Sequence, residues 1–365
     1  MPDARIYHRL PPRFACHRGS ELLDAQLAYE TWGTLNAQRS NGVLILTGLS
    51  PSAHAASSAL DPEAGWWEFM IGPGKAIDTN RFFVICVNSL GSCKGSTGPA
   101  SIDPVSQRAY RVSFPELTLE DIARSAADLV RALGIQELAA LVGPSMGGMS
   151  VLAYLMQSPT AARGILNISA APRSLPFALA LRSLQREAIV SDPAWLDGHY
   201  TDDAWPKMGM RLARKIGVIT YRSAQEWRYR FAREPLRGSQ VPAHSFAGGF
   251  QIESYLEGHA QRFSAAFDPC CYVYLSRAMD WFDLTEYGGT MPALKAVRAE
   301  RALVIGVKTD LLFPPDQQLE IAEGLRGAGI STEFAELDSI QGHDAFLVDT
   351  ERFAPRVARF FAHLD

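Results

Sequence analysis

Residues 143–147 read Gly-Pro-Ser-Met-Gly, a Gly-x-Ser-x-Gly pentapeptide that places Ser145 where it could act as a nucleophile. An apolar run at 138–142 precedes the pentapeptide, and a helix-compatible segment at 149–156 follows it. A strand, a sharp turn and a helix in this order expose the serine hydroxyl, and small residues at both glycine positions relieve crowding in the turn. The pattern predicts acyl transfer through Ser145. The alternative is a surface turn whose serine caps a helix.

A serine hydroxyl is a weak nucleophile unless a neighbouring base takes its proton. Where a serine lies on such a turn, an acid and then a histidine follow it along the chain. Asp310 comes soon after an apolar run at 302–307, and His343 lies in a late loop. We therefore predict that His343 accepts the proton of Ser145. Asp310 would fix the tautomer of His343 and stabilise the imidazolium.

Other residues of the same types compete for these roles. Asp316 and Asp344 lie close to Asp310 in the sequence and could be the acid instead. His54 could line the same pocket. The remaining histidines lie near the chain ends or in a segment without strand signals: His8, His17, His199, His244, His259 and His363.

The tetrahedral intermediate of acyl transfer carries a negative oxygen that needs N–H donors. The N–H of Met146, directly after the nucleophile, should supply one of them. A loop after an early strand usually supplies the other, and residues 47–50 follow an apolar run at 43–46. We therefore expect the N–H of Leu49 to be the second donor.

Short continuous apolar runs indicate strands that are buried on both faces, as in a parallel sheet. Helical patterns alternate with these runs. Residues 119–133 place apolar side chains on one face, Thr118 and Asp121 form a capping box before them, and Gly134 ends the pattern. The alternation predicts an α/β protein, and the serine motif specifies the α/β-hydrolase fold with a mostly parallel central sheet. The strand-like runs are 43–46, 82–87, 138–142, 164–168 and 302–307.

Strand signals disappear between about residues 172 and 292, where helical spacing and many aromatic residues take over. The simplest account is a helical insertion between two strands of the sheet. We predict that residues 1–171 and 296–365 form the α/β-hydrolase core and that residues 172–295 form a lid.

The composition argues against several other classes. The 365-residue chain has a net charge of −4 with scattered basic residues, so nothing favours nucleic acid. No apolar run approaches the roughly 18–20 residues that span a bilayer, and the N-terminus lacks the core of a signal peptide. Five cysteines without Cys-x-x-Cys spacing favour reduced thiols over disulfides or zinc. The glycine-rich segment 91–97 lacks the ending of a phosphate loop. We expect a soluble, cytoplasmic protein without a metal.

Longer strings resemble the homoserine O-acyltransferase family, and the likeness runs from about residue 20 to the C-terminus. Members move an acyl group from a coenzyme A thioester to the side-chain hydroxyl of a small amino acid, through an acyl-serine and without a metal. The resemblance implies a homodimer and matches Ser145, Asp310 and His343 to the family's triad. The matching strings are residues 65–67, 70–79, 95–99, 145–149 and 342–349.

The resemblance also implies roles for three further residues. Arg214 and Tyr221 match a pair at the pocket entrance, and Asp344 matches a position linked to the amino group of the acceptor. Without the family, Arg214 could be a solvated helix charge, and Asp344 could stiffen a loop.

Two departures from the family pattern bear on the substrates. Homoserine acetyltransferases typically read Leu-Thr-Gly-Asp where this chain has Leu49, Ser50, Pro51 and Ser52. The exchange stiffens the loop and removes a charge, and family members that act on serine have a pattern of this kind. These four residues are therefore predicted to set acceptor specificity, with a neutral loop variant as the alternative.

The second departure is Arg182, which stands where many acetyl-transferring relatives have an asparagine. Its guanidinium could hold the free carboxylate of a succinyl group by a bidentate hydrogen bond, which an acetyl group cannot accept. Arg186 or Arg173 could do this instead, or all three could be surface charges.

Together these features predict ping-pong transfer of a succinyl group from succinyl-CoA to the hydroxyl of L-serine, in cysteine synthesis. Succinyl-CoA is a co-substrate, no cofactor is expected, and the partners are small molecules. The alternatives are a homoserine O-succinyl- or O-acetyltransferase in methionine synthesis, and a serine esterase that uses the same triad.

Overall fold

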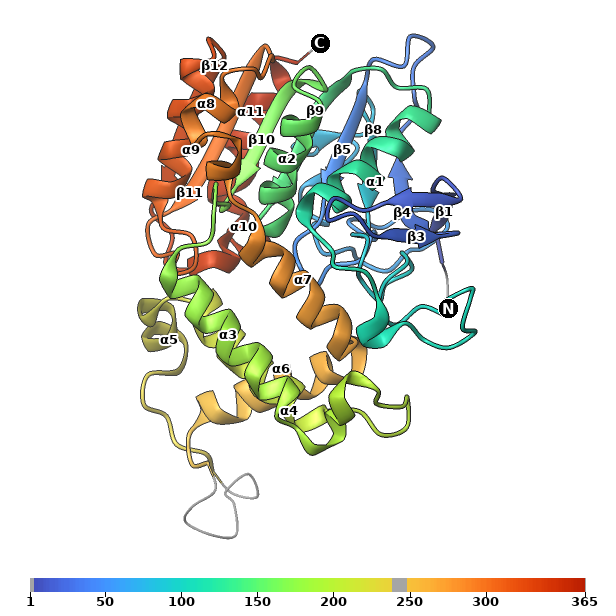
Figure 1. The fold of residues 1–365 in the computed structure, drawn as a ribbon. Coiled ribbons are helices and arrows are strands. Elements are labelled where there is room, and N and C mark those ends of the chain that lie inside the picture. Colours follow the sequence, from blue (N-terminus) through green and yellow to red (C-terminus); the bar gives the residue numbers. More distant parts are fainter. Residues whose placement is uncertain (1–2, 238–247, 365) are drawn as a thin grey trace.

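The computed structural model describes residues 3–237 and 248–364 (Figure 1). Its main element is an eight-stranded sheet in the order β1-β4-β8-β5-β9-β10-β11-β12. The pairs β1–β4 and β4–β8 are antiparallel, whereas every pair from β8 through β5 to β12 in this order is parallel. The bounds are β1 Ile6–Arg9, β4 Gln26–Trp32, β8 Phe83–Val87, β5 Gly42–Leu46, β9 Leu138–Pro144, β10 Ala162–Ile168, β11 Arg301–Val307 and β12 Ser331–Leu337.

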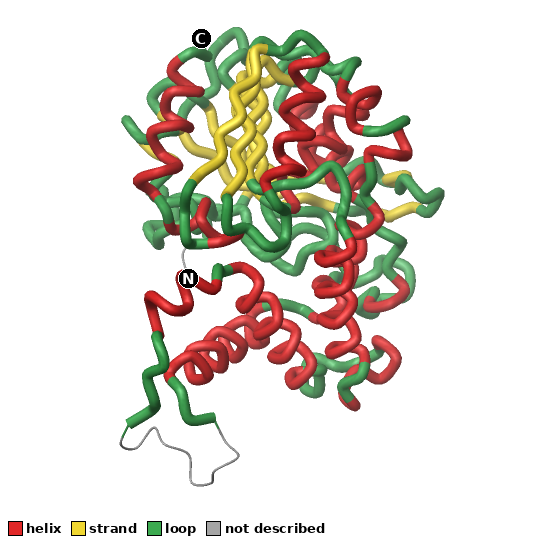
Figure 2. The backbone as a smooth tube through the Cα atoms, turned by 90° about the vertical axis from the view of Figure 1, so that its left-hand side faces the viewer, coloured by secondary structure: helices red, strands yellow, loops and turns green. Residues whose placement is uncertain are grey.

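Helices cover both faces of this sheet (Figure 2). Neighbouring residues of β5 alternate between two apolar cores, as the period of two in a strand requires. Leu44 and Leu46 belong to the core that contains α1, α2 and α9, and Val43 and Ile45 belong to the core that contains α11. The bounds are α1 Leu119–Ala132, α2 Met146–Gln157, α9 Pro315–Gly327 and α11 Thr350–Ala362.

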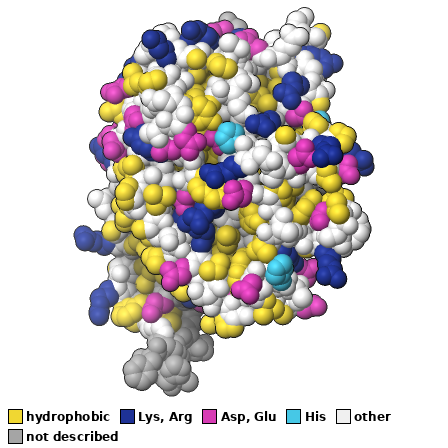
Figure 3. Space-filling view, in the orientation of Figure 1, with side chains coloured by type: hydrophobic (Ala, Val, Ile, Leu, Met, Phe, Trp, Pro, Cys, Tyr) yellow, Lys and Arg dark blue, Asp and Glu magenta, His cyan; other side chains and the backbone are white. Residues whose placement is uncertain are grey.

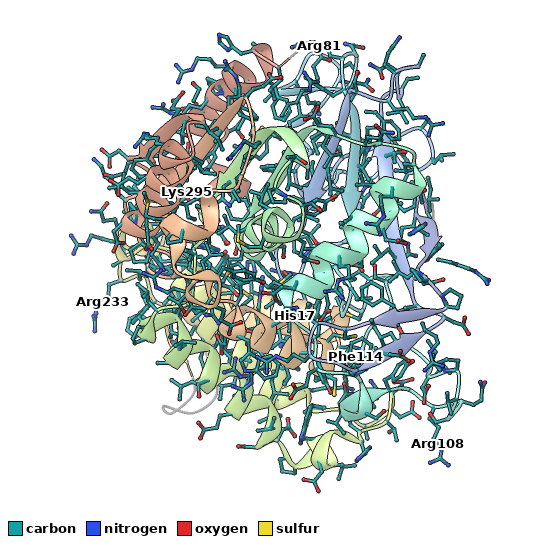
Figure 4. All side chains as sticks on the ribbon, turned by 45° about the horizontal axis from the view of Figure 1, so that its top comes forward. His17, Arg81, Arg108, Phe114, Arg233 and Lys295 are labelled. Carbon is teal, nitrogen blue, oxygen red and sulfur yellow. The ribbon has the colours of Figure 1, made fainter. Side chains whose placement is uncertain are left out.

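Local signals place α1 where the sequence predicts a helix, and burial and capping contacts hold α11. At the start of α1, Thr118 Oγ1 accepts from the N–H of Asp121 at 3.3 Å, and Asp121 Oδ2 accepts from the N–H of Thr118 at 2.9 Å. Four aromatic and aliphatic side chains of α11 are buried against the sheet. The end of α11 is held by Arg81, labelled in Figure 4, which donates to the carbonyls of Phe361 and Leu364 at 3.2 and 2.7 Å.

Residues 172–295, the predicted lid, contain the helices α3 to α8 (Figure 1). In the described part of this segment there is no strand of the main sheet. Helices α3 to α7 lie together beyond one end of the sheet, whereas α8 packs against α9 of the core. The helical layer beyond the sheet therefore ends with α7, before the boundary drawn from the sequence. The bounds are α3 Pro176–Val190, α4 Lys207–Tyr221, α5 Ala224–Phe231, α6 Gln251–Ala266, α7 Pro269–Trp281 and α8 Thr290–Leu294.

The remaining elements are small. Two further strand pairs flank the sheet, and short helical turns connect the larger elements. Within the described residues, no helix combines the length and the apolar character that crossing a bilayer requires. The small elements are β2 Arg13–Ala15, β3 Glu21–Leu23, β6 Ile71–Gly72, β7 Ile77–Asp78, η1 Arg111–Ser113, η2 Pro193–Gly198, η4 Leu284–Tyr287, η5 Gly342–Asp344 and α10 Ala345–Val348.

Candidate active site

Ser145 lies on the sharp turn between β9 and α2, at the carboxyl end of the parallel strands. Its backbone has φ 57° and ψ −125°, a conformation that residues other than glycine rarely adopt. A Cβ on Gly143 would overlap the carbonyl oxygen of Gly147, and a Cβ on Gly147 would overlap that of Leu46. Both glycines of the pentapeptide are therefore required by the close approach of backbone segments around the turn.

The structure brings Ser145, His343 and Asp310 together from three separate loops. His343 Nε2 lies 2.8 Å from Ser145 Oγ, and His343 Nδ1 lies 2.7 Å from Asp310 Oδ2. Asp310 Oδ1 accepts from two backbone N–H groups, those of Leu312 at 2.9 Å and Phe313 at 3.0 Å. Because those donors fix the carboxylate, its other oxygen remains aimed at the imidazole.

The surroundings of His343 set its proton affinity. Burial by itself lowers the pKa of this imidazole, but the charge of Asp310 and its hydrogen bond outweigh burial, so the pKa lies above its ordinary value of 6.5. The ring is enclosed by aromatic neighbours, with Phe313 at 5.5 Å, Phe346 at 5.9 Å and Tyr221 at 6.0 Å between ring centroids. The arrangement suits a base that takes a proton from Ser145 and holds it beside a carboxylate.

Two backbone N–H groups next to Ser145 are available to an oxyanion. Within the described residues, neither the N–H of Met146 nor that of Leu49 donates to another protein group. Met146 is the first residue of α2, so its N–H points out of the helix end, where a negative charge is favoured. Leu49 follows β5, and the loop that carries it lies against the turn at Ser145.

These groups open onto a cavity of about 890 Å³, counting its mouth. The lining comes from the loops after β5, β9 and β11, from the turn η5, and from α3, α4 and α7 within residues 172–295. Such a position, at the carboxyl ends of parallel strands, is where ligands bind in open α/β sheets. The lining residues are Gly48, Leu49, Ser50, Pro51, Trp66, Pro144, Ser145, Leu181, Arg182, Gln185, Arg214, Thr220, Tyr221, Tyr272, Met279, Leu312, Phe313, His343, Asp344, Phe346 and Leu347.

Arg214 and Tyr221 both lie on the side of α4 that faces the cavity. The Arg214 guanidinium carbon lies 4.4 Å from the ring centroid of Phe263 and 5.6 Å from that of Tyr221. Its buried Nε has no hydrogen-bond partner among the described residues. A partly buried cation that contacts aromatic faces would gain strongly from a carboxylate ligand.

Asp344 lines the same cavity next to His343. Its Oδ2 lies 3.4 Å from Nε of Arg222, which also donates from Nη1 to Gln341 Oε1 at 2.7 Å. Burial raises the pKa of Asp344 above its ordinary value, although Arg222 and His343 act in the opposite direction. Asp344 is thus a carboxylate that an ammonium group in the cavity could reach. The sequence offered no signal for Arg222.

Of the three arginines considered for the acyl group, only Arg182 lines the cavity. Its Nε donates to Asp280 Oδ1 at 2.6 Å and its Nη2 donates to Ser174 Oγ, whereas Nη1 has no partner among the described residues. A carboxylate would therefore meet the Nη1 end of the group. Arg186 turns to Asp280 and Ser276, and Arg173 pairs with Glu320 on α9.

Residues 49–52, which are predicted to set acceptor specificity, include three residues that line the cavity and one that stabilises the loop. Leu49, Ser50 and Pro51 line the cavity, but Ser52 does not. Ser52 Oγ instead accepts from the N–H of His54 at 3.3 Å, and its carbonyl accepts from Trp66 Nε1 at 3.1 Å. Ser52 can therefore act on a ligand only through the shape of the loop.

His54 also supports the loop instead of lining the cavity. It bonds to buried Glu30 at 2.9 Å through Nδ1 and to the carbonyl of Glu63 at 2.9 Å through Nε2. Of the other competing residues, Asp316 is exposed at the start of α9 and His244 lies outside the described residues. Gln185, Thr220 and Tyr272 line the cavity although sequence reasoning did not single them out, because nothing local marks residues that are joined only by helix packing.

Comparison with known proteins extends the geometry to a family. A family model described as alpha/beta hydrolase fold matches residues 43–350. A protein of Frateuria aurantia named serine O-succinyltransferase is 60% identical over 367 residues, which cover all of both chains.

Solved structures agree with this placement. A homoserine O-acetyltransferase from Bacillus anthracis superposes with a TM-score of 0.89 at 30% identity, over 99% of this chain and 98% of that one. Esterase E22, as its L374D mutant, superposes with a TM-score of 0.89 at 27% identity, over 98% of both chains. These findings confirm the resemblance seen in the sequence. The chain belongs to the α/β-hydrolase fold family and, within it, to the homoserine O-acyltransferase family.

Proposed function

We propose that this protein is a serine O-succinyltransferase that moves the succinyl group of succinyl-CoA to the hydroxyl of L-serine. The observation that carries the proposal is the full-length, 60% identity to a protein named for this activity. The chemistry of the cavity supports it, because a nucleophile, a base and the guanidinium groups of Arg182 and Arg214 face one space.

In the first half-reaction, His343 takes the proton of Ser145 as its oxygen attacks the thioester carbonyl. The oxyanion is stabilised by the N–H groups of Met146 and Leu49, and Asp310 stabilises the imidazolium. The C–S bond then breaks, the CoA thiolate takes the proton from His343, and the succinyl group remains esterified to Ser145.

In the second half-reaction, L-serine enters with its carboxylate at Arg214 and its ammonium at Asp344. His343 removes the proton of the serine hydroxyl, whose oxygen attacks the acyl-enzyme. Collapse of the second tetrahedral intermediate returns the proton to Ser145 and releases O-succinyl-L-serine. Two arginines of the cavity have an N–H group without a partner among the described residues, Arg182 at Nη1 and Arg214 at Nε, and they correspond in number to the carboxylates of the succinyl group and of serine.

The acceptor is decided at residues 49–52. Proline and serine at positions 51 and 52 give a stiff, uncharged loop beside the nucleophile, which fits an acceptor one methylene shorter than homoserine. Replacement of Ser50, Pro51 and Ser52 by Thr, Gly and Asp should shift kcat/KM from serine towards homoserine. An unchanged preference would remove this loop from acceptor selection.

An esterase is the second candidate, because esterase E22 has the same fold over its whole length. The two activities differ in what the acyl-enzyme reacts with. We expect CoA release from succinyl-CoA to accelerate with L-serine, with parallel double-reciprocal plots and O-succinyl-L-serine as product. Succinate as the main product at saturating serine would instead establish a hydrolase.

We further propose that the protein acts in cysteine synthesis, in the cytoplasm, as a homodimer. A second copy would cover exposed apolar side chains on α3 and α4, of which Phe177, Leu184, Met208 and Leu212 are examples. On the face drawn in Figure 3, basic and acidic groups are interspersed with hydrophobic side chains. Light scattering on the purified protein gives the mass directly, and a monomer at micromolar concentration would contradict the dimer.

A further inference from the structure

A buried cluster of three charged side chains extends from the cavity wall into the protein. Asp280 of α7 accepts from Arg182 Nε through Oδ1 at 2.6 Å, and its Oδ2 lies 2.7 Å from Arg186 Nη2. The three side chains are only 7, 6 and 12% exposed for Arg182, Asp280 and Arg186. In the described part of the chain, no second carboxylate lies within 4.0 Å of either guanidinium.

The cluster therefore carries two positive charges and one negative charge in a place with little water. Burial lowers the pKa of Arg186 from its ordinary value, and the charges of Arg277 and Arg182 act in the same direction, against Asp280. An arginine nevertheless remains protonated at neutral pH. An excess positive charge in such surroundings is costly until an anion arrives.

The geometry directs this excess charge into the cavity. Asp280 and Ser174 occupy Nε and Nη2 of Arg182, which leaves Nη1 without a partner among the described residues. Ser174 in turn donates to the carbonyl of Met279, the residue before Asp280. Arg186 does not line the cavity, and its second contact is the hydroxyl of Ser276 at 2.8 Å.

We propose that Arg186 and Asp280 are positioning residues that keep Arg182 short of a full counter-charge, so that the cavity selects an acyl group with a terminal carboxylate. This inference rests on the proposed function. Without Arg186, Asp280 would neutralise Arg182 completely, and the carboxylate of a succinyl group would gain little. With Arg186 present, one carboxylate is shared by two cations, and the substrate supplies the second. A neutral acyl group leaves the excess positive charge of the cluster without a counter-charge, and this disfavours binding of neutral acyl groups.

The test compares kcat/KM for succinyl-CoA with that for butyryl-CoA, which has the same number of acyl carbons and no charge. Arg186→Gln keeps a hydrogen-bonding side chain near Asp280 and Ser276 but removes the charge. We expect the succinyl-to-butyryl ratio to fall roughly 10-fold or more, because one unit charge is lost from a buried network within reach of the substrate. Arg108→Gln removes an equal charge from an exposed loop position away from the cluster and should leave the ratio near that of the unaltered protein.

A double variant separates charge from structure. Arg186→Gln with Asp280→Asn leaves Arg182 as the sole charge of the cluster and restores the native excess of one, so most of the ratio should return. Failure of the double variant to recover, while circular dichroism shows it folded, would mean that Arg186 acts by packing and would overturn the inference. So would an unaltered ratio in Arg186→Gln. An unaltered protein that does not prefer succinyl-CoA would instead overturn the proposed function and the inference with it.

Discussion

Replacement of Asp310 by asparagine tests the proposed chemistry most directly. In the structure, Asp310 Oδ1 accepts from the N–H groups of Leu312 and Phe313, and Oδ2 faces Nδ1 of His343. An asparagine in this place keeps its oxygen towards the two N–H donors. Its amide nitrogen must then face Nδ1 and donate to it, which forces the imidazole proton onto Nε2. His343 in that tautomer cannot accept the proton of Ser145.

The expected loss of kcat follows from the free energy that a flipped amide at position 310 would cost. To restore the active tautomer the amide would have to flip, which leaves two buried N–H groups without acceptors at about 1–3 kcal/mol each. A total of about 2–6 kcal/mol corresponds to a loss of roughly 30- to 10⁴-fold in kcat. The upper end agrees with the loss of about 10⁴-fold for the same exchange in another serine triad.

The assay is the release of CoA from succinyl-CoA, followed with a thiol reagent at saturating L-serine. Asp316→Asn is the matched control, because Asp316 is exposed at the start of α9 and should tolerate the exchange. The melting temperature of Asp310→Asn should stay close to that of the unaltered protein, since both N–H bonds are kept. A folded Asp310→Asn variant with kcat within about threefold of the control would refute the reasoning.

Three further predictions follow from the site. The pKa of His343 is raised, so kcat/KM for succinyl-CoA should fall as the solution is acidified, with a midpoint above 6.5, and a pH–rate profile that is flat down to pH ~5.5 would contradict this. The same group should stabilise the fold at pH values below its unfolded pKa, and this contribution should be lost as the pH rises through its folded pKa. Gly147→Ala should lower the free energy of unfolding, measured by urea denaturation, by about 1–3 kcal/mol, because the new methyl group meets the carbonyl of Leu46. Gly249→Ala is the control, because the space around its Cβ is open, and it should change the free energy of unfolding by less than about 0.5 kcal/mol. Arg214→Met should raise KM for L-serine roughly 10- to 100-fold, since the aromatic rings of Phe263 and Tyr221 cannot replace the positive charge that binds a carboxylate. Steady-state kinetics at varied L-serine concentration measure this KM, and an unaltered value would place the carboxylate elsewhere.

Much of the core could be predicted because its signals are local. The five apolar runs became β5, β8, β9, β10 and β11, with ends within two residues of those expected. By contrast, β12 was missed, because exposed residues alternate with half-buried and buried ones along an edge of the sheet. The antiparallel strands β1 and β4 also carry no continuous apolar run of the kind that marks the parallel strands.

The site divides in the same way. Ser145, Asp310 and His343 follow strands or precede a helix in a fixed order, so local sequence context located them. The partners of Arg182 and Asp344 could not be found, because Asp280 reaches Arg182 only through the packing of α7 on α3, and Arg222 reaches Asp344 only through the packing of α4 on η5. Ser52 was expected at the acceptor, but its hydroxyl serves its own loop. Local sequence alone does not determine the direction in which a loop side chain points.

The backbone at Ser145 has a consequence for engineering. A serine at φ 57° and ψ −125° costs the fold about 1–3 kcal/mol, and glycine at the same place would relieve most of that strain. A library enriched only for heat resistance would therefore favour glycine at position 145 and yield sturdy proteins without turnover. Efforts to make a robust catalyst from this scaffold need a selection that couples survival on heating to product formation.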